Sequence, residues 1–249
     1  MPVLEPPRLA DYAIWGVALV LYAYDAARRM RPREFLLVEA AGGRLEPSLN
    51  ESPFTARARV LAFGPLHLPH RGVFVASWGR PRSDEAGLRA THKALARFRD
   101  SLRAARVLAA LAFAWLFLAG PALTLTLGPD AAVLYTAAGL YPTVLAAIVA
   151  LWWRRGPFRL TRARAAVLSV EILVCPAFLP NLVRKVTAPY PIEIDGAQLA
   201  VATAAPEVRA EFLVRLERRM QAMLDDEGGA DATARAQLDA YLTTLRDAG

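Results

Sequence analysis

Two long uncharged runs decide the fold: VLAALAFAWLFLAGPALTLTL at residues 107–127 and AAVLYTAAGLYPTVLAAIVALWW at residues 131–153. Only the turn Gly128-Pro129-Asp130 separates them. A helix needs about 20 apolar residues to cross the hydrocarbon core of a bilayer, and each run reaches that length. The pattern therefore predicts a transmembrane helical hairpin.

The composition of the whole chain is also typical of a membrane protein. Apolar residues make up 55% of the sequence and the mean hydropathy is +0.27, both high for a soluble domain. The formal net charge of +7 comes mostly from arginine, which in a membrane protein sets topology. We therefore expect no nucleic-acid partner. The single cysteine, Cys175, excludes an internal disulfide, and no motif indicates a cofactor.

A further transmembrane helix is expected at residues 9–27. This stretch is apolar apart from Asp11 and Asp25 near its ends, and tyrosines and a tryptophan lie toward those ends. Such aromatic rings favour the membrane interface. The leader is not basic and no cleavage pattern follows it, so the sequence predicts a retained anchor rather than a cleaved signal peptide.

Arginine-rich flanks predict the orientation of these spans. Cations cluster after the first span, before the second and after the third, so three spans place every cluster on one side. The positive-inside rule assigns that side to the cytoplasm, with the N-terminus outside. We expect a bacterial inner-membrane protein with a cytoplasmic C-terminus. The cations expected to meet lipid headgroups are Arg154, Arg155, Arg162, Arg164, Arg184 and Lys185.

The stretch EILVCPAFLPNLVRK, residues 171–185, leaves two topologies open for residues 165–183. A crossing helix would carry Glu171, Pro176 and Pro180 through lipid and would move the C-terminus outside. A mid-membrane carboxylate is unfavourable by about 3 kcal/mol, and proline removes backbone donors that lipid cannot replace. We favour a re-entrant or interfacial segment, with a kinked fourth span as the alternative.

The remaining segments predict a small cytoplasmic domain. Short strands are expected at residues 35–40, 44–49, 59–63 and 73–78, and a helix capped by Ser83 leads into the membrane. Asp195-Gly196, flanked by apolar residues, predicts a β-hairpin at residues 191–201. Two amphipathic helices follow, opened by Pro206 and by Asp231. Their apolar stripes need a surface to bury against, and the strand-rich insert is the obvious one if it shares their side of the membrane.

The predicted fold class is an α-helical polytopic membrane protein with three transmembrane helices, one re-entrant or interfacial segment and a small cytoplasmic α/β or β-rich domain. Its expected parts follow one another along the chain. They are 1–27, tail and first span; 28–82, β-rich insert; 83–106, cytoplasmic helix; 107–153, transmembrane hairpin; 154–186, basic linker and re-entrant segment; and 187–249, β-hairpin and C-terminal helices.

Few residues are candidates for chemistry. Glu171 is the sharpest, because acids inside membranes often carry protons or cations. We favour the simpler interpretation that it lies at the interface, where it reaches water or pairs with Arg162 or Arg164. Cys175 is a weaker catalytic candidate, since no base is identifiable. His67 and His70 flank a proline in an expected loop, which disfavours a metal site.

The sequence therefore favours a non-enzymatic scaffold or accessory subunit, anchored in the bilayer and binding a protein partner or a second copy through its C-terminal helices. No phosphate loop, nucleophile elbow or zinc-protease motif is present. Two alternatives remain open. One is a membrane-embedded enzyme or proton-coupled component that uses Glu171, and the other is an oligomeric transporter or channel subunit.

Overall fold

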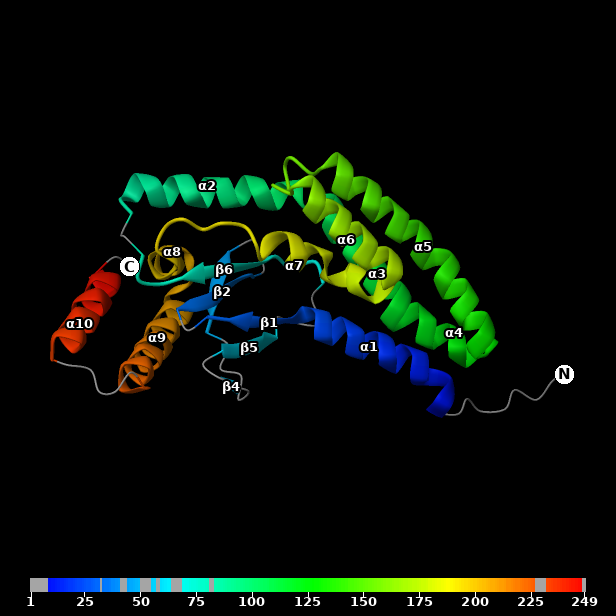
Figure 1. Cartoon of the computed structure of the whole chain (residues 1–249), viewed down its shortest axis with the longest axis horizontal. Coiled ribbons are helices and arrows are strands. Elements are labelled where there is room, and N and C mark those ends of the chain that lie inside the picture. Colours follow the sequence, from blue (N-terminus) through cyan, green and yellow to red (C-terminus); the bar gives the residue numbers. More distant parts are fainter. Residues whose placement is uncertain are drawn as a thin grey trace. The chain divides into compact units, whose positions relative to one another are not determined.

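The computed structural model describes residues 9–31, 33–40, 44–49, 55–56, 59–63, 69–80, 83–226 and 232–247, and these are mostly helical. The chain divides into two compact units (Figure 1). The helical unit comprises Met1–Ala27, Phe63–Arg71 and Arg97–Val186. The α/β unit comprises Arg28–Ala62, Gly72–Ala96 and Thr187–Gly249.

Two helices of the helical unit are long and apolar enough to cross a membrane, Arg103–Leu127 and Pro129–Trp153. The first contains α3 (Arg103–Ala114), a π-helical turn (Trp115–Ala119) and α4 (Gly120–Leu127), and the second is α5 (Pro129–Trp153). The predicted helical hairpin is therefore present (Figure 1). Gly128 connects the arms with a positive φ of 83°, a conformation that glycine adopts without steric strain.

The π-helical turn ends just before Pro121, the second residue of α4. A proline ring clashes with the carbonyl four residues earlier in a regular helix and donates no hydrogen bond. The wider turn gives this proline room without ending the helix. The sequence alone did not reveal this irregularity.

The first predicted span is a short helix. Residues 9–12 form a 3-10 turn, and α1 (Ala13–Ala26) continues for 14 residues. On α1, Trp15 covers Gly120, where an added Cβ would lie 2.5 Å from the indole ring. The same indole donates a hydrogen bond from Nε1 to Thr124 Oγ1 at 2.9 Å. A glycine surface thus lets α1 approach α4 closely. That α1 crosses a membrane stays a prediction.

The segment at residues 165–183 is not one continuous helix. α6 (Arg162–Val174) ends at Cys175, a 3-10 helix (Pro176–Asn181) follows, and α7 (Leu182–Thr187) comes next. Lys185 Nζ lies 2.6 Å from Glu171 Oε2. In a straight helix these two residues would be about 21 Å apart, so the chain folds back on itself. This geometry suits the re-entrant or interfacial topology, whose place in a membrane stays a prediction.

The α/β unit is built on an antiparallel sheet of order β3-β2-β6, namely β3 (Leu45–Ser48), β2 (Glu34–Glu39) and β6 (Val73–Ser77). A second sheet has the order β1-β5-β4, namely β1 (Ala27–Met30), β5 (Arg59–Phe63) and β4 (Thr55–Ala56). Each strand predicted for the insert is present. Phe35 pairs with Ala76 and Leu37 with Phe74, so these side chains share one face of the first sheet.

Helices cover that face. α2 (Glu85–Ser101) precedes α3 as predicted, although its cap is Asp84 rather than Ser83: Gly87 N donates to Asp84 Oδ1 at 2.8 Å. α8 (Gly196–Thr203) approaches β6 at Ala76, whose Cβ would lie only 2.5 Å from a Cβ added to Gly196. Because any side chain at position 196 would collide with Ala76, only glycine fits as the first residue of α8.

The C-terminal helices α9 (Pro206–Asp226) and α10 (Ala232–Asp247) bury their apolar stripes inside the α/β unit. Phe212 of α9 packs against Phe35 of β2 with ring centroids 5.1 Å apart. The other buried residues of the stripes are Leu216, Leu238, Leu242 and Leu245. Burial against the strand-rich insert is confirmed for α9, whereas α10 packs against α8 and α9. These buried residues are therefore not available to a partner. Asp231, the expected cap of α10, lies outside the described residues.

The predicted hairpin at residues 191–201 is wrong. Asp195-Gly196 begins α8 instead: Gln198 N donates to Asp195 Oδ1 at 3.0 Å, which is an N-terminal cap. The Asp-Gly pair fits a hairpin turn and a helix start equally well. The following Ala-Gln-Leu-Ala sequence has high helix propensity, and this preference decides the outcome.

Candidate functional site

Glu171 belongs to a charged cluster in the helical unit. The Lys185 ammonium lies 2.6 Å from Glu171 Oε2 and 2.7 Å from Asp25 Oδ1. The exposed side-chain fractions are 12% for Lys185, 13% for Asp25 and 34% for Glu171. Three helices supply these residues: α1 carries Asp25, α6 carries Glu171 and α7 carries Lys185. The cluster therefore ties three distant parts of the chain together.

Uncharged groups extend this cluster toward the end of α1. Asn181 Nδ2 donates to the Tyr22 carbonyl at 2.9 Å and to Asp25 Oδ2 at 3.1 Å. Arg184 Nη1 donates to Asn181 Oδ1 at 3.0 Å, and its guanidinium lies 5.8 Å from the centre of the Tyr22 ring. Asn181 thus bonds to the backbone of α1 four residues before its last residue, Ala26.

The charges of the cluster balance. It contains two carboxylates, Asp25 and Glu171, and two cations, Arg184 and Lys185. The cations also lie near the C-terminal end of α1, where the helix dipole favours positive charge. Both carboxylates contact the same Lys185 ammonium. The arrangement is suited to holding α1, α6 and α7 together.

Two expectations about these residues need correction. Glu171 pairs with Lys185 rather than with Arg162 or Arg164. Arg184 and Lys185 were expected to face lipid headgroups, yet Arg184 is 6% exposed and both cations bond to protein groups. They turn inward because the chain folds back after Cys175. The other cations of that set remain at the surface: Arg154, Arg162 and Arg164 are exposed, and Arg155 is half-buried.

The remaining predicted site residues are not brought together. Cys175 is the half-exposed cap residue at the end of α6, and its backbone N–H donates to the Glu171 carbonyl at 2.9 Å. His70 is exposed, and His67 lies outside the described residues. Among the residues that the structure describes, no three His, Cys, Asp or Glu side chains group as metal ligands would. The metal hypothesis therefore gains no support from the described part of the chain.

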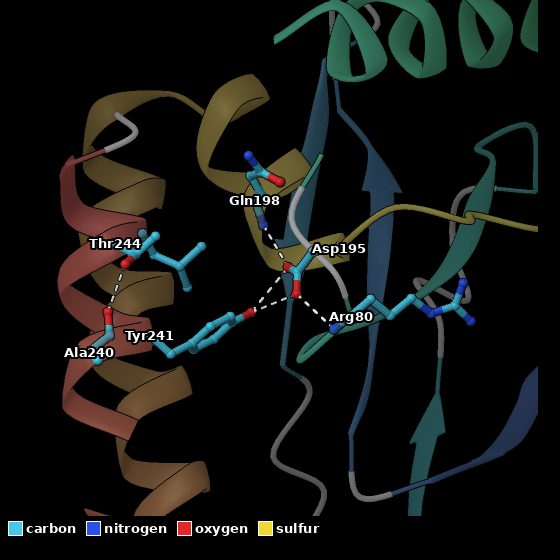
Figure 2. Close-up of a pocket in the computed structure, with 7 residues that line it drawn as sticks. Arg80, Asp195, Gln198, Ala240, Tyr241 and Thr244 are labelled. Atoms are coloured by element: carbon cyan, nitrogen blue, oxygen red, sulfur yellow. Dashed lines mark hydrogen bonds between the residues drawn. The ribbon is translucent and has the colours of Figure 1, made fainter. Parts of the chain in front are cut away.

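A second candidate site is a cavity of about 320 Å³ in the α/β unit (Figure 2). It lies between α10, the start of α8 and the turn after β6. Figure 2 shows Tyr241 reaching from α10 toward Asp195, while the Arg80 side chain extends away from α10. The residues that line this cavity are Arg80, Asp195, Gln198, Ala240, Tyr241, Thr244 and Leu245.

Asp195 is the centre of this site and is 2% exposed. Its Oδ2 accepts hydrogen bonds from Gly79 N at 2.8 Å and Arg80 N at 3.1 Å, while Oδ1 accepts one from Gln198 N at 3.0 Å. The Tyr241 hydroxyl donates to the same carboxylate at 3.0 Å. One carboxylate therefore joins the turn after β6, the start of α8 and α10.

Burial and the charge of Asp195 raise the pKa of the Tyr241 phenol. A phenol that keeps its proton remains a hydrogen-bond donor to the carboxylate. Gln198 is also committed, since its amide donates to and accepts from the backbone of Ser83 at 2.9 and 3.1 Å. The polar groups at this cavity thus bond to one another, and Ala240 and Leu245 contribute an apolar wall. Among the described residues that line it, this cavity therefore combines an apolar wall with polar groups that already have partners.

Among the residues of these two sites that sequence reasoning missed are Asp25, Asn181, Asp195 and Tyr241. Asp25 was placed at the end of a span but given no partner, and Asp195 was assigned to the wrong turn. Asn181 and Tyr241 carried no sequence signal, since their partners lie far away in the chain. Asp195 could have been found from its position before a run of strong helix formers.

Comparisons with protein-family models, with curated proteins and with solved structures find no match for this chain.

Proposed function

We propose that this protein is a membrane-anchored scaffold or accessory subunit, in which the helical unit is embedded in a bilayer and the α/β unit folds in water. The division of exposed surface carries this proposal. Apart from Val214, the large apolar side chains that are exposed among the described residues all belong to the helical unit. They include Val20, Leu134 and Val174, each at least 67% exposed. Such a surface is stable against lipid and prone to association in water.

The state of the polar groups supports a non-enzymatic role. In the charged cluster the Lys185 ammonium occupies both carboxylates, and in the α/β unit the Asp195 carboxylate is saturated by four donors. General acid and base catalysis needs a group that can exchange a proton with a substrate. Groups bound to each other in this way serve architecture more readily than chemistry.

Extraction of membranes with sodium carbonate tests the anchor. We expect the full-length protein to remain in the membrane pellet at pH 11 and to dissolve only with detergent, because the helical unit has an apolar exterior. Recovery in the carbonate supernatant would contradict the membrane-embedded role, whatever the α/β unit binds.

Photo-crosslinking in native membranes tests the scaffold. A photoreactive residue at Val214, the exposed apolar position of α9 that is 48% exposed, should give an adduct with another chain. The same residue at Arg89, whose side chain is 70% exposed on α2 and pairs with Glu85, provides a control on a charged surface. If neither Val214 nor other exposed positions of the α/β unit give adducts, the scaffold role is wrong.

A further inference from the structure

A second cleft in the α/β unit has a different character from the cavity beside Asp195. Its volume is about 200 Å³, and two arginines, Arg28 of β1 and Arg80, are among its lining residues. Its walls come from β1, the start of β2, β6 with the turn after it, and the segment that precedes α8. The other lining residues are Glu34, Val75, Ala76, Ser77, Ala188, Pro189, Tyr190, Pro191 and Ile192.

Among the described residues that line this cleft, two arginines face one carboxylate, that of Glu34. Arg80 Nη1 donates to the Ile192 carbonyl at 2.6 Å, and no ion pair joins Arg28 or Arg80 to an acid in the part of the chain that the structure describes. Glu34 also lines the cleft and interacts electrostatically with Arg28. Arg31 engages it as well, since its backbone N donates to Oε2 at 3.0 Å and its Nε lies 3.9 Å from Oε1. The cleft therefore retains a positive balance, which favours an anion.

One of the two arginines, Arg28, follows α1 closely along the chain. Arg28 is two residues beyond Ala26, the last residue of α1. An extended chain rises at most about 3.5 Å per residue, so the Arg28 backbone lies within roughly 7 Å of that helix end. If α1 ends at the membrane surface, as the proposed function requires, Arg28 is at headgroup depth.

We propose that the cleft lined by Arg28 and Arg80 binds a phosphate ester, supplied by the headgroup of an anionic phospholipid. Guanidinium groups bind phosphate through paired charge-assisted hydrogen bonds, and two of them line this cleft. The lipid as the source rests on the proposed membrane anchor. The phosphate site itself does not, because its residues all belong to the α/β unit.

Thermal unfolding of the full-length protein in a neutral detergent tests this site. The additives are phosphatidylglycerol, phosphatidylcholine and soluble glycerol 3-phosphate. Wild-type protein should gain stability with phosphatidylglycerol in a saturable manner, and more than with phosphatidylcholine. Arg28→Gln and Arg80→Gln should each weaken this effect roughly tenfold in the lipid concentration required, because each removes a charged donor.

Arg29→Gln is the matched control. Arg29 is exposed on the same strand but is absent from the lining of the cleft, because successive strand residues point to opposite faces. The Arg29→Gln variant loses the same charge one residue away, and lipid should stabilise it as much as it stabilises the wild type. Equal responses of wild type, Arg28→Gln and Arg80→Gln would overturn the site. If Arg28→Gln and Arg29→Gln lose the same amount of lipid stabilisation, the effect comes from general surface charge, and this result would also overturn the site.

Soluble glycerol 3-phosphate separates the two sources of phosphate. Stabilisation by phosphatidylglycerol alone supports the lipid headgroup. Stabilisation by glycerol 3-phosphate that Arg28→Gln abolishes supports the phosphate site and overturns the lipid as its source. The latter result together with release of the protein by carbonate would reject the anchor while leaving the site standing.

Discussion

The helical unit and the α/β unit stabilise their buried carboxylates by different means. Asp25 in the helical unit is held mainly by the Lys185 cation, whereas Asp195 in the α/β unit is held by three backbone N–H groups and one phenol. Backbone donors inside a helix are already used, and only helix starts and turns leave them free. The difference teaches that side chains, above all a cation, compensate the acid of the helical unit, whereas mainly backbone donors compensate that of the α/β unit.

The largest effect should follow from breaking the charge pairing. Lys185→Met leaves two carboxylates without their shared cation, and loss of one partner of a buried ion pair costs about 3 kcal/mol or more. Denaturation of the purified protein in detergent micelles measures it. Lys93→Met, at an exposed lysine of α2, should change stability little. If both variants are equally stable, the cluster contributes nothing to the fold.

Removal of the neutral donor network should have the next largest effect. Asp195→Ala deletes the cap of α8 and leaves the N–H groups of Gly79 and Arg80 without their acceptor. Loss of a cap and of buried hydrogen bonds together costs about 2 to 3 kcal/mol. Asp195→Asn retains one acceptor oxygen and should lose less. If Asp195→Ala has the same free energy of unfolding as the wild type, the hydrogen bonds from uncharged donors to Asp195 do not stabilise the fold.

Close packing can be compared across both units with glycine substitutions. Gly120→Ala would drive a Cβ to 2.5 Å from Trp15, and Gly196→Ala would drive one to 2.5 Å from Ala76. Both should destabilise by about 1 to 3 kcal/mol because neither neighbour has free space. Gly16→Ala on α1 meets nothing within 4 Å and should stabilise slightly, since alanine favours a helix. Equal unfolding temperatures for all three variants would contradict these contacts.

A smaller effect with a distinct pH dependence is expected at Tyr241. Tyr241→Phe removes one hydrogen bond to Asp195, worth about 1 kcal/mol at neutral pH. The folded state raises the pKa of this phenol, so above about pH 10 the unfolded chain ionises while the folded chain does not. The contribution of Tyr241 is thus present below pH 10 and is lost as the pH rises further. Urea titrations of both proteins between pH 8 and 11 should show their stability difference shrinking.

The smallest effect is expected for Glu171→Gln. Glu171 is the more exposed carboxylate of the cluster, and Lys185 retains Asp25 when it is changed, so the loss should stay below about 1 kcal/mol. Growth of cells that depend on the protein should be unaffected. Loss of cellular function with an unchanged unfolding curve would favour the enzyme or proton-coupled alternative over the scaffold.

The sequence was most informative where local patterns decide structure. The helical hairpin, the strands of the insert and α9 follow from uncharged length, alternation and proline placement, and all are present. It failed at Asp195-Gly196, where two local structures share one signature and helix propensity chose between them. The charged cluster was beyond prediction, because Asp25 and Lys185 meet across a separation that only tertiary folding closes. The burial of Arg184 was not predicted for the same reason, since it lies over Tyr22, which is also far away in the sequence.

The break between α6 and the following 3-10 helix contains one residue that can be labelled chemically in the wild-type chain. Cys175 is its sole cysteine and is half-exposed at that break. A polarity-sensitive maleimide dye added to wild-type protein would therefore attach at one known position, without any engineered background. Its emission would shift toward blue in hydrocarbon and toward red in water, so the colour of one label reports the surroundings of the turn.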